Sequence, residues 1–231
     1  MTQHDDLVQS QIEYYRARAP EYDEWFQRQG RYDRGPEFKA RWDEDVDEVR
    51  DALSKQGPRG QVVEFACGTG LWTERLIQQT DHVTALDISS ESLEFNRVRV
   101  GTNKVTHVCT DLFDWKPPHA FDGAFFGFWL SHVPPDRFEQ FWERVGGALK
   151  KDGRVFFVDS RYAPRSTAKD HGLEGPESVA VTRRLNDGRA FRIVKIFYEP
   201  GELRARLAKL GWSVEVHETR EFFIYGFGQP S

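Results

Sequence analysis

The chain has 231 residues, of which 39% are hydrophobic, and a formal net charge of −5 at pH 7. This length and apolar content suit one domain with a full hydrophobic core. The acidic balance argues against non-specific binding to nucleic acid, and no apolar run is long enough to cross a membrane. Residues 1–6 also lack the positive-then-apolar pattern of a secretory signal, so we expect a cytoplasmic protein.

Two helical regions are expected before the first strand. Residues 5–28 show an approximate helical spacing of apolar and aromatic residues, interrupted at Pro20. A glycine- and charge-rich loop with Tyr32 near its middle follows, and Pro36 can open a further helix that runs to about Ser54. The acidic residues of that helix are expected to form a solvated face; they are Asp43, Glu44, Asp45, Asp47 and Glu48.

A glycine turn occupies the middle of the first predicted strand-to-helix unit. The apolar run that begins at Val62 enters a turn with Gly68 and Gly70, and the helix-compatible segment 71–79 leaves it. Glycine at such a turn permits positive φ and lets a ligand approach the backbone, while the helix start offers free N–H groups. These features predict a nucleotide-type pocket. A dinucleotide fingerprint would place its last glycine where Thr73 stands.

Further short strands follow, each ending near a polar residue. The strand over 83–88 contains Asp87, which could accept both ribose hydroxyls of a nicotinamide or methionine-type cofactor, or could simply begin the helix capped at Ser89. Asp111 follows a strand over 105–109. Strands are also expected over 121–126 and 155–159. The two cysteines, at positions 67 and 109, lack metal-ligand spacing, and we expect both to be buried reduced thiols.

The pattern Glu64-x-Ala66-x-Gly68-x-Gly70 resembles the first motif of class I S-adenosylmethionine-dependent methyltransferases, with alanine in place of the first glycine. The resemblance implies an α/β, Rossmann-like seven-stranded sheet with an N-terminal helical lid and, here, an inserted β-hairpin. It also implies S-adenosyl-L-methionine as the cofactor. The positions implied to contact that cofactor are Tyr15, Tyr22, Glu64, Ala66, Gly68, Gly70, Asp87, Ile88, Asp111, Leu112 and Phe128.

The loop after the fourth strand carries His132, which should lie beyond the carboxyl ends of the strands, where open α/β sheets bind ligands. Its imidazole could remove a proton from the acceptor, or it could only hold the loop through one hydrogen bond. Asp159 ends the fifth strand and should also point toward the pocket. These two residues could serve a divalent cation such as Mg²⁺, so the metal requirement stays open. Between them, a helix over 135–150 is expected, with a buried stripe of Phe138, Phe141, Trp142, Val145 and Leu149.

The last third of the chain begins with a polar segment, 160–178, expected to be a mobile excursion over the active site. Two strands, 179–185 and 189–198, then form a hairpin, and a two-residue turn at 187–188 would place Arg183 opposite Arg192. These cations could decorate a solvated edge or clamp an anionic acceptor. A helix over 200–210 and strands over 212–219 and 221–227 should complete the sheet.

We expect residues 1–231 to form a single methyltransferase domain. Within it, residues 1–56 would be the helical lid and 57–160 the cofactor-binding core. Residues 161–198 would form the acceptor-side loop and hairpin insertion, and 199–231 the end of the sheet. The small-molecule acceptor would be bound by a monomer or a homodimer. Two other classes stay open: a nicotinamide oxidoreductase, and a cofactor-binding module that lacks catalysis or methylates proteins.

Several segments resemble phosphonate O-methyltransferases of the dehydrophos pathway more closely; they are residues 11–19, 111–115, 129–134 and 187–195. The resemblance implies an acceptor site of Tyr32, His132, Arg183 and Lys195, with His132 and Tyr32 in the catalytic group. Arg183 and Lys195 would hold phosphonate oxygens. The chain also resembles sugar 1-O-methyltransferases of methylmannose polysaccharide synthesis. Because the 160–178 excursion departs from the phosphonate enzymes, we expect O-methylation of a mannoside hydroxyl, with a phosphonate oxyanion as the alternative.

Overall fold

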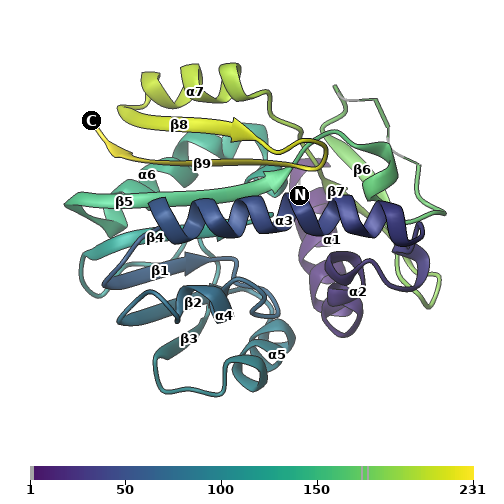
Figure 1. The fold of residues 1–231 in the computed structure, drawn as a ribbon, viewed down its shortest axis with the longest axis horizontal. Coiled ribbons are helices and arrows are strands. Elements are labelled where there is room, and N and C mark those ends of the chain that lie inside the picture. Colours follow the sequence, from purple (N-terminus) through teal and green to yellow (C-terminus); the bar gives the residue numbers. More distant parts are fainter. Residues whose placement is uncertain (1–2, 173, 176) are drawn as a thin grey trace.

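The computed structural model describes residues 3–172, 174–175 and 177–231. Its centre is a seven-stranded sheet in the order β3-β2-β1-β4-β5-β9-β8 (Figure 1). Strands β3, β2, β1, β4 and β5 are parallel to one another, and β9 is antiparallel to both β5 and β8. The α/β, Rossmann-like class is confirmed. The strands are β1 Gln61–Phe65, β2 His82–Asp87, β3 Val105–Cys109, β4 Phe121–Gly127, β5 Leu149–Ser160, β8 Trp212–Glu218 and β9 Phe223–Pro230.

Helices cover both faces of this sheet, so its central strands are mostly apolar, with Glu64 as a buried exception in β1. Val62, Val63 and Phe65 of β1 are fully buried. One face packs against α6 and α7, and the other against α3, α4 and α5. The helices are α1 Gln3–Arg18, α2 Tyr22–Gln27, α3 Pro36–Gln56, α4 Thr73–Leu76, α5 Ser90–Val100, α6 Phe138–Ala148 and α7 Pro200–Lys209. No helix among the described residues is long and apolar enough to cross a membrane.

The helices follow the expected pattern with three corrections. Pro36 opens α3, and α6 buries the predicted stripe from Phe138 to Val145, but Leu149, the last residue of that stripe, begins β5 instead. However, Asp45 of α3 is not on a solvated face: it is buried and accepts hydrogen bonds from the Thr219 hydroxyl and from two backbone N–H groups. The helix expected over 71–79 is a single turn, α4, because i→i+3 hydrogen bonds tighten the chain directly after it.

The two cysteines differ in exposure. Cys67 is buried beside the glycine turn, as expected, whereas Cys109 is exposed. Cys109 lies on β3, which forms one edge of the sheet, and edge strands have only one neighbour to cover them. The expectation that both thiols are buried is therefore wrong for Cys109.

A separate hairpin, formed by β6 Ala180–Arg184 and β7 Ala190–Val194, packs beside α1 (Figure 1). Its register is one residue away from the prediction. Arg183 pairs with Phe191, and Arg192 pairs with Thr182. The turn is a three-residue loop, because Leu185 pairs with Arg189 and Gly188 adopts φ 89°. A glycine in the left-handed region is typical of three-residue hairpin loops.

Correcting the register changes which side chains share a face. The predicted opposition of Arg183 and Arg192 does not occur, since the two lie on opposite faces of the hairpin. Directly paired and alternate residues share a face, so Arg183 lies with Ile193 and Lys195. The hairpin therefore presents Arg183 and Lys195 on the face that packs toward α1.

Candidate active site

The glycine turn after β1 has the left-handed backbone that the sequence predicted. Gly68 and Gly70 have φ of 53° and 90°, and Ala66 also has a positive φ. A Cβ on Gly68 would point into open space, whereas a Cβ on Gly70 would lie 2.9 Å from the Asn96 side chain. Gly68 therefore leaves room for a ligand, and Gly70 is required because α5 packs against the turn.

Asp87 fixes this turn to the end of β2. Its carboxylate accepts hydrogen bonds from the Gly68 N–H at 2.9 Å and from the Ser89 N–H at 2.8 Å. Burial raises the pKa of Asp87, while these backbone donors oppose the shift. Ser89 itself caps α5, since its hydroxyl accepts the Ser92 N–H. The two interpretations of Asp87 thus coincide: it lies at the helix start and faces the cavity.

A cavity of about 910 Å³, the glycine-turn cavity, opens between this turn and helices α1 and α2. Its lining combines two acidic groups, Asp87 and Asp111, with the backbone of Gly68 and apolar side chains. The predicted cofactor positions that line it are Tyr15, Tyr22, Ala66, Gly68, Asp87, Ile88, Asp111, Leu112 and Phe128.

Two predicted positions do not line this cavity. Glu64 lies behind the turn, where it lines a smaller adjoining cavity and accepts a hydrogen bond from the Thr73 hydroxyl at 2.6 Å. Burial raises the pKa of Glu64 to about 8. Gly70 faces Asn96 instead. Both residues shape the turn from behind rather than facing the larger cavity.

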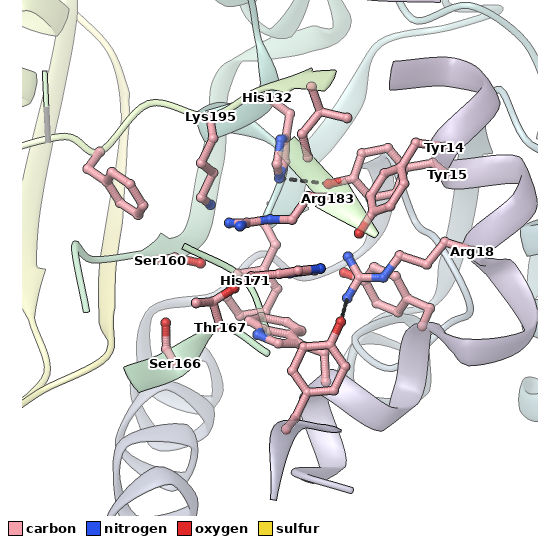
Figure 2. Close-up of a pocket in the computed structure, with 16 residues that line it drawn as sticks. Tyr14, Tyr15, Arg18, His132, Ser160, Ser166, Thr167, His171, Arg183 and Lys195 are labelled. Atoms are coloured by element: carbon pink, nitrogen blue, oxygen red, sulfur yellow. Dashed lines mark hydrogen bonds between the residues drawn. The ribbon is translucent and has the colours of Figure 1, made fainter. Parts of the chain in front are cut away.

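A second cavity of about 600 Å³, the cationic cavity, lies between α1, the hairpin and the 160–178 segment (Figure 2). It shares four lining residues with the glycine-turn cavity: Tyr15, Tyr22, Phe128 and His132. The two cavities therefore meet at these side chains. The predicted acceptor residues Tyr32, His132, Arg183 and Lys195 all line it.

The charge of the cationic cavity is one-sided. Arg18, Arg183 and Lys195 line it, and no Asp or Glu occurs among its described lining residues. Within the described chain, Arg18 Nε and Arg183 Nη1 are buried without a hydrogen-bond partner. Buried donors are ordinarily paired, so these two are free to bind a ligand. The whole chain is acidic, yet this cavity is cationic.

Lys195 is the most constrained of the three cations. Its Nζ donates to the Ser131 hydroxyl at 2.8 Å and lies 3.5 Å from Asp159. Burial lowers the pKa of Lys195 to about 8, although Asp159 opposes the shift. The Asp159 carboxylate does not line either cavity: it is buried and also accepts the Ser131 N–H. The expectation that Asp159 points into the pocket is therefore wrong.

His132 lies where the two cavities meet, held at both ring nitrogens. Nδ1 lies 2.7 Å from the Val194 carbonyl oxygen, which can only accept, so Nδ1 carries the proton. Burial, with Lys195 nearby, lowers the pKa of His132 well below its usual value, so the ring is neutral. Nε2 is then an acceptor, and the Tyr15 hydroxyl donates to it at 2.8 Å (Figure 2).

Tyr32 and Arg18 lie on the other wall of the cationic cavity. Tyr32 is buried in the short turn Gly30–Tyr32, and its hydroxyl accepts a hydrogen bond from Arg18 Nη2 at 3.5 Å. The Arg18 guanidinium also lies over the rings of Tyr14 and Tyr22. Sequence reasoning missed Arg18. Helical spacing could have found it, because residue 18 shares a helix face with Tyr14 and Tyr15.

Described residues of the 160–178 segment line the cationic cavity; they are Ser160, Ser166, Thr167 and His171. Three arginines of the 28–34 loop hold this segment. Arg28 donates to the Ser166 carbonyl, Arg34 to the Thr167 carbonyl, and Arg31 to the Asp170 carboxylate. No pattern in the sequence signals these long-range contacts, so the lining residues of this segment were not predicted.

The described part of the chain offers no ligand cluster for the divalent cation considered from the sequence. Across the described residues, no group of three or more His, Cys, Asp or Glu side chains is placed to hold a metal ion. His132 and Asp159 are both engaged in other hydrogen bonds.

Comparisons with known proteins agree with this geometry. A methyltransferase-domain family model matches residues 62–153. The structure of a DhpI–SAM–HEP complex aligns over 100% of both chains, with 42% identity and a TM-score of 0.78. A DhpI–SAH complex aligns with 41% identity over 100% of this chain and 99% of DhpI, with a TM-score of 0.77.

Curated relatives match shorter parts. The ribosomal RNA small subunit methyltransferase A of Salinibacter ruber is 40% identical over 58 residues, 25% of this chain and 20% of that protein. An uncharacterized methyltransferase of Bacillus licheniformis is 27% identical over 53% of this chain and 60% of its own length. The chain thus spans less than two thirds of either relative.

These findings settle the family and the cofactor. A Cβ at Gly68 would enter open space, and Asp87 and Asp111 line the same cavity, so the residues present fit an adenosyl cofactor. The cofactor is S-adenosylmethionine. The comparisons give no support to the mannoside acceptor that the sequence favoured. With 41–42% identity to DhpI over its whole length, the chain belongs to the class I S-adenosylmethionine-dependent methyltransferases.

Proposed function

We propose that this enzyme is an O-methyltransferase that transfers a methyl group to an oxygen of a small phosphonate oxyanion. The observation that carries the proposal is the cationic cavity, in which Arg18, Arg183 and Lys195 face a common space with no carboxylate among the described lining residues. Asp159 lies near Lys195, but a neutral sugar would bring no counter-charge to Arg18 and Arg183, which is costly for cations with little access to solvent. DhpI, whose structure aligns with this chain over its whole length, is a phosphonate O-methyltransferase, and this similarity supports the same acceptor class.

The two cavities suggest a division of roles. The nine predicted positions around the glycine turn would hold the cofactor, with Asp87 toward the ribose and Asp111 toward the adenine amino group. When bound, S-adenosylmethionine supplies a methyl group on a sulfonium that is already an activated leaving group. Tyr32, Arg183 and Lys195 would hold the acceptor. Arginine forks suit the oxygens of phosphonate-type groups.

The shared residues would then align the reaction. Tyr15, Tyr22, Phe128 and His132 lie at the boundary between the two cavities. Holding two reactants in line can contribute roughly 7–11 kcal/mol to lowering a barrier. An oxyanion already carries a reactive lone pair, so no proton has to be removed. We therefore assign neutral His132 to positioning the Tyr15 hydroxyl at this boundary, rather than to general base catalysis.

An acceptor screen tests the proposal. The purified enzyme and S-adenosylmethionine are incubated with simple alkyl phosphonates, methyl mannosides and free sugars, each with and without a chelator. We expect S-adenosylhomocysteine and a methyl phosphonate ester with the phosphonates alone, unaffected by the chelator. Methylation of a mannoside, with phosphonates left unchanged, would contradict the acceptor assignment.

A matched pair of hairpin variants links the activity to the cavity. Arg183 lines it, whereas Arg192 is exposed on the opposite face of the same hairpin. Removing a hydrogen bond to a charged group costs about 1.5–3 kcal/mol, so Arg183→Met should lower kcat/KM for the phosphonate about tenfold to a hundredfold. Arg192→Met should behave like the parent enzyme. Equal effects of the two variants would mean that Arg183 has no specific role in acceptor binding.

A further inference from the structure

His171 is a lining residue of the cationic cavity that no family resemblance assigned to the site. It belongs to the 160–178 segment, and Figure 2 shows it among the labelled side chains of Arg183, Arg18 and Thr167. Its ring nitrogens have different surroundings. Nε2 lies within hydrogen-bond distance of two protein groups, whereas Nδ1 has no hydrogen-bond partner among the described residues. This difference shows which of the two nitrogens carries the ring proton.

Nε2 is a hydrogen-bond acceptor. His171 Nε2 lies 2.9 Å from the Arg184 backbone nitrogen and 2.8 Å from Arg31 Nη2, and both of these groups can only donate. Nε2 therefore carries no proton. Burial, together with Arg183 and Arg31 nearby, lowers the pKa of His171 to about 4, so the ring is neutral at pH 7. The single ring proton is consequently on Nδ1.

The Nδ1–H group has no partner in the described part of the chain, although the atom is buried. A buried donor left unpaired costs free energy, so it calls for an explanation. Folding does not supply one, because the hydrogen bonds that the His171 ring makes to the rest of the protein use Nε2. Two other lining residues share this property: Arg18 Nε and Arg183 Nη1 are also buried donors without partners in that part of the chain.

We propose that His171 is an acceptor-binding residue whose Nδ1–H donates to an oxygen of the bound oxyanion, beside Arg18 and Arg183. This inference rests on the proposed function. Three N–H donors from three separate elements suit a tetrahedral group, which offers three oxygens. His171 adds its hydrogen bond without adding charge, and its Nε2 contacts fix the direction in which that bond points.

Two substitutions separate the roles of the two ring nitrogens. In His171→Gln, the amide oxygen can take the place of Nε2 and accept from Arg184 and Arg31, but the donor at Nδ1 is lost. In His171→Asn, the amide nitrogen can replace the Nδ1 donor, but the Nε2 acceptor is lost. The measurement is the Kd of ethylphosphonate for protein saturated with S-adenosylhomocysteine, by calorimetry. Arg183→Met is a reference, and S-adenosylhomocysteine affinity and Tm report the integrity of each variant.

We expect His171→Gln to raise the Kd of ethylphosphonate about tenfold to a hundredfold, the effect of losing one hydrogen bond to a charged group. His171→Asn should stay within about threefold of the parent. Normal binding by His171→Gln, or a larger loss in His171→Asn, would overturn the assignment while leaving the proposed function intact if Arg183→Met is impaired. Failure of the parent itself to bind ethylphosphonate would overturn both.

A measurement on the unsubstituted protein makes the result independent of variant folding. In protein labelled with ¹⁵N-histidine, His171 should show a protonated Nδ1 and an unprotonated Nε2. Adding ethylphosphonate should move the Nδ1 proton resonance downfield, as expected for a new charge-assisted hydrogen bond. A protonated Nε2, or an Nδ1 resonance unchanged at saturation, would contradict the proposal.

Discussion

Single residues of the cationic cavity carry donors that the fold itself does not use. Tyr32, His132, Arg183 and Lys195 could be predicted by resemblance. His132 and Lys195 lie in segments that resemble the phosphonate O-methyltransferases, and the likeness over nearly the whole chain implied Tyr32 and Arg183. Arg18 and His171 could not be named as readily. Arg18 lies close in the sequence to Tyr14 and Tyr15, whose helical spacing is equally consistent with packing in the core and with binding a ligand. For His171, nothing local in the sequence signals that Arg31 and Arg184 orient its ring.

The lowered pKa of Lys195 leads us to expect that kcat/KM depends on pH. Its pKa is lowered to about 8, so the unliganded enzyme holds a charged lysine below pH 8 and loses that charge above it. An anionic acceptor binds better to the charged form. We therefore expect kcat/KM to be maintained up to about pH 8 and to fall about tenfold for each further pH unit.

The Lys195→Arg variant provides the control for this profile. Its guanidinium stays charged throughout the range, and comparing the two enzymes on one acceptor cancels the acceptor's own titration. The alkaline fall should disappear in the variant, whose Tm verifies that it is folded. An identical fall in both enzymes would show that a different group titrates.

Whole elements position the site through a few long-range contacts. Asp23 of α2 accepts a hydrogen bond from the Thr69 hydroxyl at 2.7 Å and pairs with Arg99 of α5. Arg99 also donates to the Thr69 carbonyl at 2.9 Å. These contacts fasten α2 to the glycine turn and to α5. Tyr22, next to Asp23, lines both cavities, so the same contacts set the position of a predicted cofactor residue.

Removing the Asp23 contacts should weaken cofactor binding. The groups are partly exposed, so their contribution is discounted to about 1 kcal/mol. We expect Asp23→Ala to raise the Kd of S-adenosylhomocysteine about fivefold, measured by calorimetry. Glu13→Ala is the matched control, because Glu13 is an exposed acid of α1 bonded only locally to Gln9. Similar affinities in the two variants would show that the Asp23 contacts do not contribute to cofactor binding.

The elements themselves were largely predictable, and the exceptions have physical causes. Apolar runs and the glycine turn located the strands, since strands buried on both faces leave a strong pattern. The hairpin register was missed by one residue, because Asn186-Asp187-Gly188 suits a two-residue or a three-residue loop. The backbone N–H and side-chain amide of Asn186 bind Glu21 and Glu24, tertiary contacts that sequence spacing does not contain.

At the scale of the whole molecule, the sheet brings distant segments to one end. His132 follows β4, Lys195 follows β7, and Asp87 ends β2, yet all lie around the adjoining cavities. The order β3-β2-β1-β4-β5 reverses direction beside β1, where open α/β sheets bind ligands. The division into a lid, a cofactor core and an acceptor-side insertion stays a prediction. The acceptor class was not predictable from the sequence alone, because the charge of the cavity arises from α1 and the hairpin together, two elements that are far apart in the sequence.

A crystal structure of the enzyme with S-adenosylhomocysteine and ethylphosphonate tests the central claim most directly. The account predicts the thioether in the glycine-turn cavity and the phosphonate among Arg18, Arg183 and Lys195. One phosphonate oxygen should face the sulfur across the boundary formed by Tyr15 and His132. A phosphonate bound elsewhere, or a thioether in the cationic cavity, would contradict the account.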